Sequence, residues 1–287
     1  MLKLIPVILF VSLSISSAAQ RIPMDANSRP PKNSASGKEG GKSTDKSKSA
    51  TVQNGTNQYH DLLMMYLDGD LDKCLKKSLK TIEDEKTSKD PLPYVYAAMC
   101  YLDFWNDEEA RKDYPEGLKD ALKMAARYRK KDERNSQKQG LDYLEFWDGN
   151  KEFFAKLRQN TKAEAQKMLD EGKPAKAEGW YKLITAFDEG DYSSYYALYT
   201  LRSAAGDTAQ ANANYRAFKT SMEKVKDDLA YEPDDRLQLL KYAAMEHAKF
   251  LIRENRTPLA KETVDEIMAY LKKDAELSNF VQANNLR

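Results

Sequence analysis

Residues 206–218 read GDTAQANANYRAF, and residues 172–184 read GKPAKAEGWYKLI. Glycine, alanine, tyrosine and a large apolar residue stand at the same four offsets in both stretches, which begin 34 residues apart. The matched positions are Gly172, Ala177, Tyr181 and Ile184 in one stretch and Gly206, Ala211, Tyr215 and Phe218 in the other. A fixed period of this length predicts an array of repeated structural units.

Apolar residues recur at helical spacing through most of the chain. The segments LDKCLKKSLKTI (71–82) and LLKYAAMEHAKFLI (239–252) each place their apolar residues on one face of a helix. No long segment alternates apolar and polar residues, and good helix formers dominate. The sequence therefore predicts an all-α fold.

Polar residues with Gly or Pro predict where the helices end. We expect breaks at 68–70, 89–93, 132–136, 147–150, 171–174, 189–191, 205–207, 231–235 and 254–258, with helices over 208–229 and 234–254. Gly should end a helix in the left-handed conformation, and Pro174 and Pro258 suit the first turn of the next helix. Such short joints favour antiparallel hairpins that stack as a solenoid or a bundle.

The repeated positions resemble the tetratricopeptide repeat, a helix–turn–helix unit. Weaker copies begin at Gly69, with Cys74 at the alanine position, and at Asn255, followed by Ala260, Val264 and Ile267. Tyr199 departs from the family, because it stands where that family has a small residue. The resemblance implies a right-handed α-solenoid of antiparallel hairpins, and a generic array of helical hairpins is the alternative.

The resemblance also implies a partner-binding groove along the first helix of each repeat. A mixture of Tyr, Gln, Lys and hydroxyl side chains suits an extended peptide held by hydrogen bonds and one aromatic anchor. The expected groove residues are Gln159, Lys162, Gln166, Ser193, Tyr196, Thr200 and Ser203.

The N-terminal segment predicts export. Lys3 precedes an apolar run over 4–15, and Ser17 and Ala19 fit a small-x-small cleavage pattern, so we expect a signal peptide over 1–19. A retained anchor is the alternative. Residues 20–57 are rich in Ser, Lys and Gly and predict a disordered linker. We expect N-terminal hairpins with insertions over 58–150 and C-terminal hairpins over 151–287.

Composition and motifs argue against several function classes. A formal net charge of +1 disfavours nucleic-acid binding. The two histidines, His60 and His247, belong to no metal or catalytic motif, and no nucleotide-binding loop occurs, so we expect no catalytic residue, metal or cofactor. Cys74 and Cys100 are the two cysteines. Buried free thiols and a disulfide are both compatible with their apolar helix positions.

These observations predict an exported scaffold, periplasmic or secreted, that binds a protein or peptide in a bacterial cell-envelope assembly or secretion machine. No integral span is expected after signal cleavage. A helical module that binds carbohydrate or cell-wall polymer through tyrosine rings is the alternative, and an enzyme of unknown type is a third hypothesis.

Overall fold

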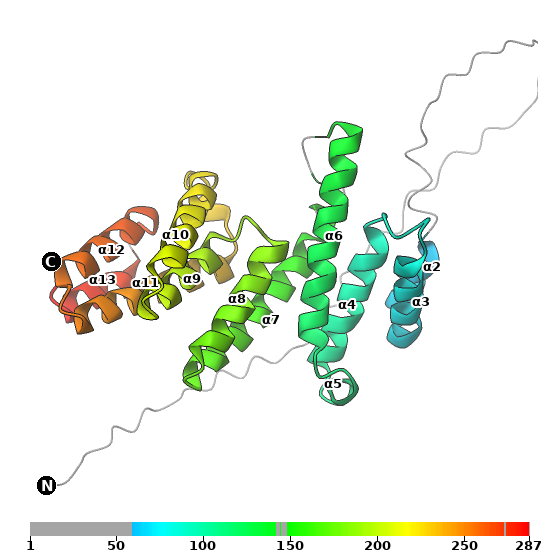
Figure 1. Cartoon of the computed structure of the whole chain (residues 1–287), viewed down its shortest axis with the longest axis horizontal. Coiled ribbons are helices and arrows are strands. Elements are labelled where there is room, and N and C mark those ends of the chain that lie inside the picture. The colour runs from blue at the N-terminus through cyan, green and yellow to red at the C-terminus, as the bar shows by residue number, and fades with distance from the viewer. Residues whose placement is uncertain (1–58, 142–143, 145–147, 273, 287) are drawn as a thin grey trace, which may run out of the picture. The chain divides into compact units, whose positions relative to one another are not determined.

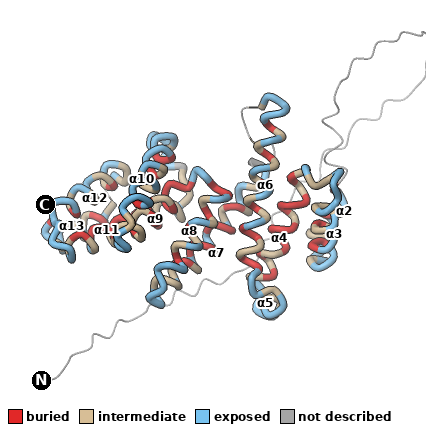
Figure 2. The backbone as a smooth tube through the Cα atoms, viewed as in Figure 1, coloured by how far each residue is buried: buried red, intermediate tan, exposed pale blue. Residues whose placement is uncertain are grey.

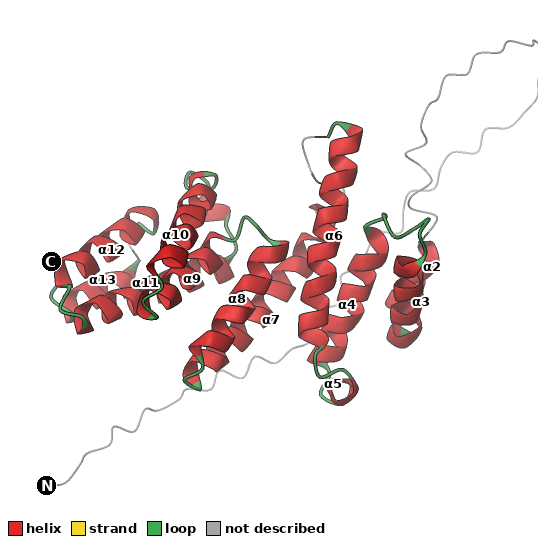
Figure 3. Ribbon diagram, in the orientation of Figure 1, coloured by secondary structure: helices red, strands yellow, loops and turns green. Residues whose placement is uncertain are grey.

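The computed structural model describes residues 59–141, 144, 148–272 and 274–286. These residues form α-helices and short 3-10 turns with no strand (Figure 3), so the predicted all-α class is confirmed. The expected signal peptide over 1–19 and the linker over 20–57 lie outside the described residues.

Twelve α-helices are described, in two groups separated by the segment around residue 145. The first group is α2 (His60–Leu67), α3 (Leu71–Glu83), α4 (Leu92–Asn106), α5 (Ala110–Asp113) and α6 (Gly117–Gln139). The second is α7 (Lys151–Asp170), α8 (Pro174–Phe187), α9 (Tyr192–Ala204), α10 (Thr208–Glu223), α11 (Asp234–Arg253), α12 (Thr257–Tyr270) and α13 (Ala275–Ala283).

Helices pack mainly on helices that are close to them in the chain (Figure 1). The main hairpins pair α7 with α8, α9 with α10, and α11 with α12. Contacts of α8 with α9 and of α9 with α11 join one hairpin to the next. The buried residues gather along the helix faces that meet in these contacts (Figure 2).

Each of four hairpin turns contains one residue in the left-handed backbone conformation. The backbone angle φ is +78° at Gly69, +70° at Gly172, +76° at Gly206 and +58° at Asn255. Glycine adopts this conformation without a Cβ clash, and Asn is the next most tolerant residue. After Gly172, the Lys173 N–H donates to the Met168 carbonyl at 2.8 Å, which closes the end of α7. Each turn therefore reverses the chain within a few residues.

A small side chain stands five residues after each of these left-handed residues. These side chains are Cys74, Ala177, Ala211 and Ala260, and they are 0–3% exposed. The larger side chains of Tyr181, Ile184 and Phe218 are also at most 1% exposed. A small residue at that position lets the second helix of the hairpin approach the first.

Two of the expected helix boundaries are wrong. The break expected at 132–136 is absent, because α6 continues to Gln139 and ends at the left-handed Gly140. Asp132 and Ser136 lie on the buried face of that helix, four residues apart. The helix expected over 208–229 ends at Glu223. The expectation for Pro174 and Pro258 is confirmed, since both lie in the first turn of a helix.

One hydrophobic cluster extends from Tyr94 to Leu286, so the packing is continuous across the expected boundary between 150 and 151. A smaller cluster contains Cys74, Leu75, Ala97, Cys100 and Phe104. Both cysteines are free and fully buried. The structure therefore has two buried thiols in place of a disulfide.

We predict that Ala211→Leu destabilises the fold, because overpacking a tight helix crossing costs about 1–3 kcal/mol. Ala211 is 3% exposed, whereas Ala209 is exposed on the same helix. For a domain of this size, the melting temperature should fall by roughly 2–4 °C for each kcal/mol. Thermal denaturation of both variants measures the effect. Equal melting temperatures for Ala211→Leu and Ala209→Leu would show that Ala211 is not at a crossing.

Candidate functional site

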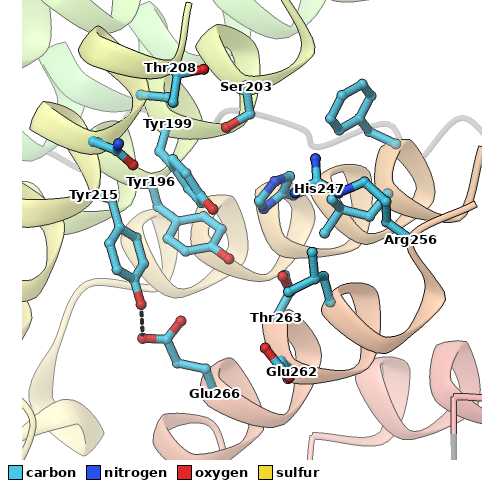
Figure 4. Close-up of a pocket in the computed structure, with 15 residues that line it drawn as sticks. Tyr196, Tyr199, Ser203, Thr208, Tyr215, His247, Arg256, Glu262, Thr263 and Glu266 are labelled. Carbon is cyan, nitrogen blue, oxygen red and sulfur yellow. Dashed lines mark hydrogen bonds between the residues drawn. The ribbon is translucent and has the colours of Figure 1, made fainter. Parts of the chain in front are cut away.

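A pocket of about 460 Å³ lies between the α9–α10 hairpin and the α11–α12 hairpin (Figure 4). All four helices and the turn before α12 contribute to its wall. Its lining residues are Tyr196, Tyr199, Ser203, Thr208, Ala211, Asn212, Tyr215, His247, Phe250, Leu251, Arg256, Leu259, Glu262, Thr263 and Glu266. The volume falls in the range of small-ligand sites.

Three tyrosine rings form one wall of the pocket. Tyr199 packs against Tyr196 with ring centroids 5.5 Å apart and against Tyr215 at 5.0 Å. Tyr196 in turn contacts the buried Phe218 at 4.8 Å. Burial raises the pKa of Tyr196 well above its usual value, and it also raises that of Tyr199. The hydroxyls of both residues therefore stay protonated at neutral pH and are able to donate a hydrogen bond.

His247 of α11 lines the pocket next to Tyr199 and is 3% exposed. Its ring meets Tyr199 edge-on, with centroids 4.6 Å apart, and stacks on Phe250 at 6.3 Å. Nδ1 is buried and has no hydrogen-bond partner among the described residues. Burial, assisted by the charge of Arg256, lowers the pKa of His247 to about 4. The imidazole is therefore neutral at pH 7 and has unused hydrogen-bonding capacity.

Charged groups line the opening of the pocket. Glu266 accepts hydrogen bonds from the Tyr215 hydroxyl at 2.7 Å and from Lys219 Nζ at 2.8 Å. Arg256 and Glu262 are exposed, and neither side chain forms an ion pair with a described residue. The pocket thus offers one cation and one anion without a protein partner, beside aromatic rings and hydroxyls.

The seven residues expected to form a groove do not gather in one place. Ser193, Tyr196, Thr200 and Lys162 are buried, at 0–8% exposure. Gln159, Lys162 and Gln166 line a second cavity against α11, and Thr200 lines a third. Tyr196 and Ser203 contribute to the pocket between the two hairpins. Partner binding by the seven residues stays a prediction.

The ammonium group of Lys162 is bound by other side chains of the protein. Its Nζ lies 2.7 Å from Asp235 Oδ2, 3.1 Å from Asp191 Oδ2 and 3.0 Å from Ser193 Oγ. Burial alone would raise the pKa of Asp191, but Lys162 and two arginines hold it below its usual range. These contacts join α7, α9 and α11, so Lys162 and Ser193 help to fix the arrangement of these helices.

Arg158 and Arg236 complete this buried ion cluster. Arg158 Nη1 lies 2.9 Å from Asp188 Oδ2, and Arg236 Nη2 lies 2.7 Å from the same oxygen. Asp191 also caps α9, accepting hydrogen bonds from the Ser193 and Ser194 N–H groups. The cluster therefore fixes the beginning of α9, the helix that supplies Tyr196 and Tyr199 to the pocket.

Little in the sequence predicts the pocket. His247 occupies an apolar-face position of its helix, and that placement is the one signal that it is buried. Nothing in the sequence pairs it with Arg256 or with the tyrosines of α9, because those residues come from separate helices and meet only after the hairpins stack.

Comparisons with protein-family models, curated proteins and solved structures found no match to this chain. None of the helices in the described part of the chain has the length and apolar content that a membrane crossing requires. The described residues also bring together no group of three or more His, Cys, Asp or Glu side chains able to hold a metal ion.

We predict that the buried His247 makes the fold less stable as the pH falls. Its pKa is about 4 in the folded chain and about 6.5 when the ring is free. The unfolded chain therefore binds a proton first as the pH falls, and stability should decrease between pH 6.5 and 4 by about 3 kcal/mol. Urea denaturation of wild type and His247→Phe across this range measures the difference. His247→Phe should lack this loss of stability between pH 6.5 and 4. His60→Gln, which replaces an exposed histidine, should show it as wild type does.

We also predict that Lys162→Met strongly destabilises the fold, because it leaves Asp191 and Asp235 buried without their cation. Breaking a buried ion pair costs about 3–5 kcal/mol. Lys167→Met is the matched control, since Lys167 is on the same helix, 60% exposed and 3.5 Å from Glu164. An exposed pair contributes about 0–1 kcal/mol. Equal free energies of unfolding for the two variants would contradict a structural role of Lys162.

Proposed function

We propose that this chain is an exported scaffold of tetratricopeptide-like hairpins that binds a protein or peptide partner, as an accessory part of a cell-envelope assembly or secretion machine. The repeat assignment is supported by the left-handed residue at four hairpin turns and by the small buried side chain five residues after each. Stacked hairpins of this kind would continue as a solenoid. Export is supported by the apolar N-terminal segment and its cleavage pattern.

The pocket between the α9–α10 and α11–α12 hairpins is the observation that carries the binding role. It combines tyrosine rings with the hydrogen-bonding side chains of Ser203, Thr263 and Asn212. Interfaces concentrate their binding energy on aromatic and Arg side chains of this kind. We place binding ahead of catalysis, because the sequence carries no known catalytic or nucleotide-binding motif and His247 Nδ1 has no hydrogen-bond partner among the described residues.

Carbohydrate binding is a second candidate for the same pocket. The rings of Tyr199 and Tyr215 provide apolar surfaces, and Thr263 and Asn212 provide polar groups beside them. We place it second because Arg256 and the buried His247 suit a charged group better than a neutral sugar.

We predict that a photo-crosslinking amino acid at position 212 captures a discrete protein in the native cell. Asn212 is exposed and lines the pocket. Gln210 is exposed on the same helix but does not line the pocket, so the same amino acid at position 210 is the control. Mass spectrometry of the adducts should identify a partner at 212 that is absent at 210. Adducts that are the same at both positions, or that contain glycan alone, would overturn the proposal of a protein partner at this pocket.

A further inference from the structure

The imidazole of His247 lacks the hydrogen bonds that a buried polar group normally makes. Its side chain is 97% withdrawn from solvent, since the residue is 3% exposed, yet Nδ1 has no partner among the described residues. Buried polar groups in native proteins are nearly always satisfied by protein or by bound molecules. A neutral imidazole has one donor and one acceptor nitrogen, and its two ring contacts, with Tyr199 and Phe250, are aromatic packing contacts. The imidazole lines the pocket, so a molecule bound there would lie beside the ring.

Arg256 is the cation of the same pocket. It stands in the turn before α12, is exposed, and its guanidinium makes no hydrogen bond or ion pair with a described residue. It lines the pocket together with His247 and Tyr199. In Figure 4 the His247 ring lies between the tyrosine pair and Arg256. An arginine and a histidine from two separate helical segments thus line one cavity.

The acidic residues of α12 restrict which anion fits. Glu266 is held by Tyr215 and Lys219, and Figure 4 draws it beside Tyr215, away from Arg256. Glu262 lines the pocket without an ion pair. A dianion such as phosphate would be repelled by Glu262 more strongly than a monoanion. A carboxylate carries one charge and matches the planar fork of a guanidinium.

We propose that the pocket receives a carboxylate of the bound peptide, from an acidic side chain or from its C-terminus. The carboxylate accepts hydrogen bonds from the Arg256 guanidinium and from an N–H of the His247 imidazole. Phe250 and Leu259 form the apolar wall that covers the neighbouring part of the peptide. This inference rests on the proposed peptide-binding function and names the chemical group that the pocket recognises.

The proposal is tested with small probes, so that it does not depend on knowing the partner. The full chain carrying His60→Gln retains His247 as its one histidine, and its ring resonances are followed by NMR. Phenylacetate is the carboxylate probe, phenylacetamide is its neutral isostere, and N-acetylglucosamine is the sugar probe. Phenylacetate should shift the His247 resonances at millimolar concentration and raise the pKa of His247 by about one pH unit. Phenylacetamide and the sugar should have little effect.

Arg256→Gln should weaken phenylacetate binding by about tenfold or more, because a hydrogen bond to a charged group is lost. Arg253→Gln removes the same charge from an exposed arginine that does not line this pocket and should bind as wild type. Equal binding of the amide, equal loss in the two arginine variants, or no response to phenylacetate would overturn the carboxylate site. These results do not depend on the crosslinking experiment, so a failed carboxylate site and a failed peptide-binding function are distinguishable.

Discussion

The closeness of the two helices in each hairpin is the constraint on which the rest of the structure depends. A left-handed residue reverses the chain, and a small side chain five residues later removes the steric obstacle at the crossing. When the two helices of a hairpin are close, their outer faces are left to pack against the next hairpin. The pocket exists because α9–α10 and α11–α12 meet through α9 and α11 while their second helices, α10 and α12, stand apart enough to leave a cavity.

The buried ions show how a mainly apolar array fixes the position of one helix. Three cations and three aspartates lie at the junction of α7, α8, α9 and α11, with distances between 2.7 and 3.4 Å. The strength of each ion pair depends on the distance between its charged atoms, so a displacement of one helix weakens it. Because Asp191 both joins this cluster and caps α9, the position of the tyrosine wall is set by charges some distance from the pocket.

Local patterns were enough to predict the helices and most of their ends. The turns at Gly172, Gly206 and Asn255 could be predicted, because each needs a left-handed backbone conformation that glycine adopts most easily and asparagine next. The break expected at 132–136 failed for a related reason: its polar residues contain no Gly or Pro, and two of them point into the protein. Polar character alone does not end a helix when the polar groups lie on the buried face.

The candidate site was not predictable in the same way. A spacing rule taken from one repeat family placed Lys162 and Tyr196 on a groove, but Lys162 is buried against Asp235 of α11 and Tyr196 against Phe218 of α10. The rule describes one helix at a time, and burial depends on which helix comes next and how far it extends. Arg256 and His247 belong to neighbouring elements and meet the α9 tyrosines only across a hairpin junction, which no periodicity within one segment encodes.

The two thiols of the first hairpins have a consequence for chemistry in solution. Cys74 lies on α3 and Cys100 on α4, and both are fully shielded from solvent. Cys74 Sγ also donates to the Leu62 carbonyl at 3.5 Å, which ties α3 to α2. A reagent or oxidant can reach either sulfur only when these helices separate, because a thiol reacts from an open state. The rate at which the two cysteines are alkylated therefore measures how often the first hairpins open. The hairpins from α7 onward contain no cysteine and do not contribute to this rate.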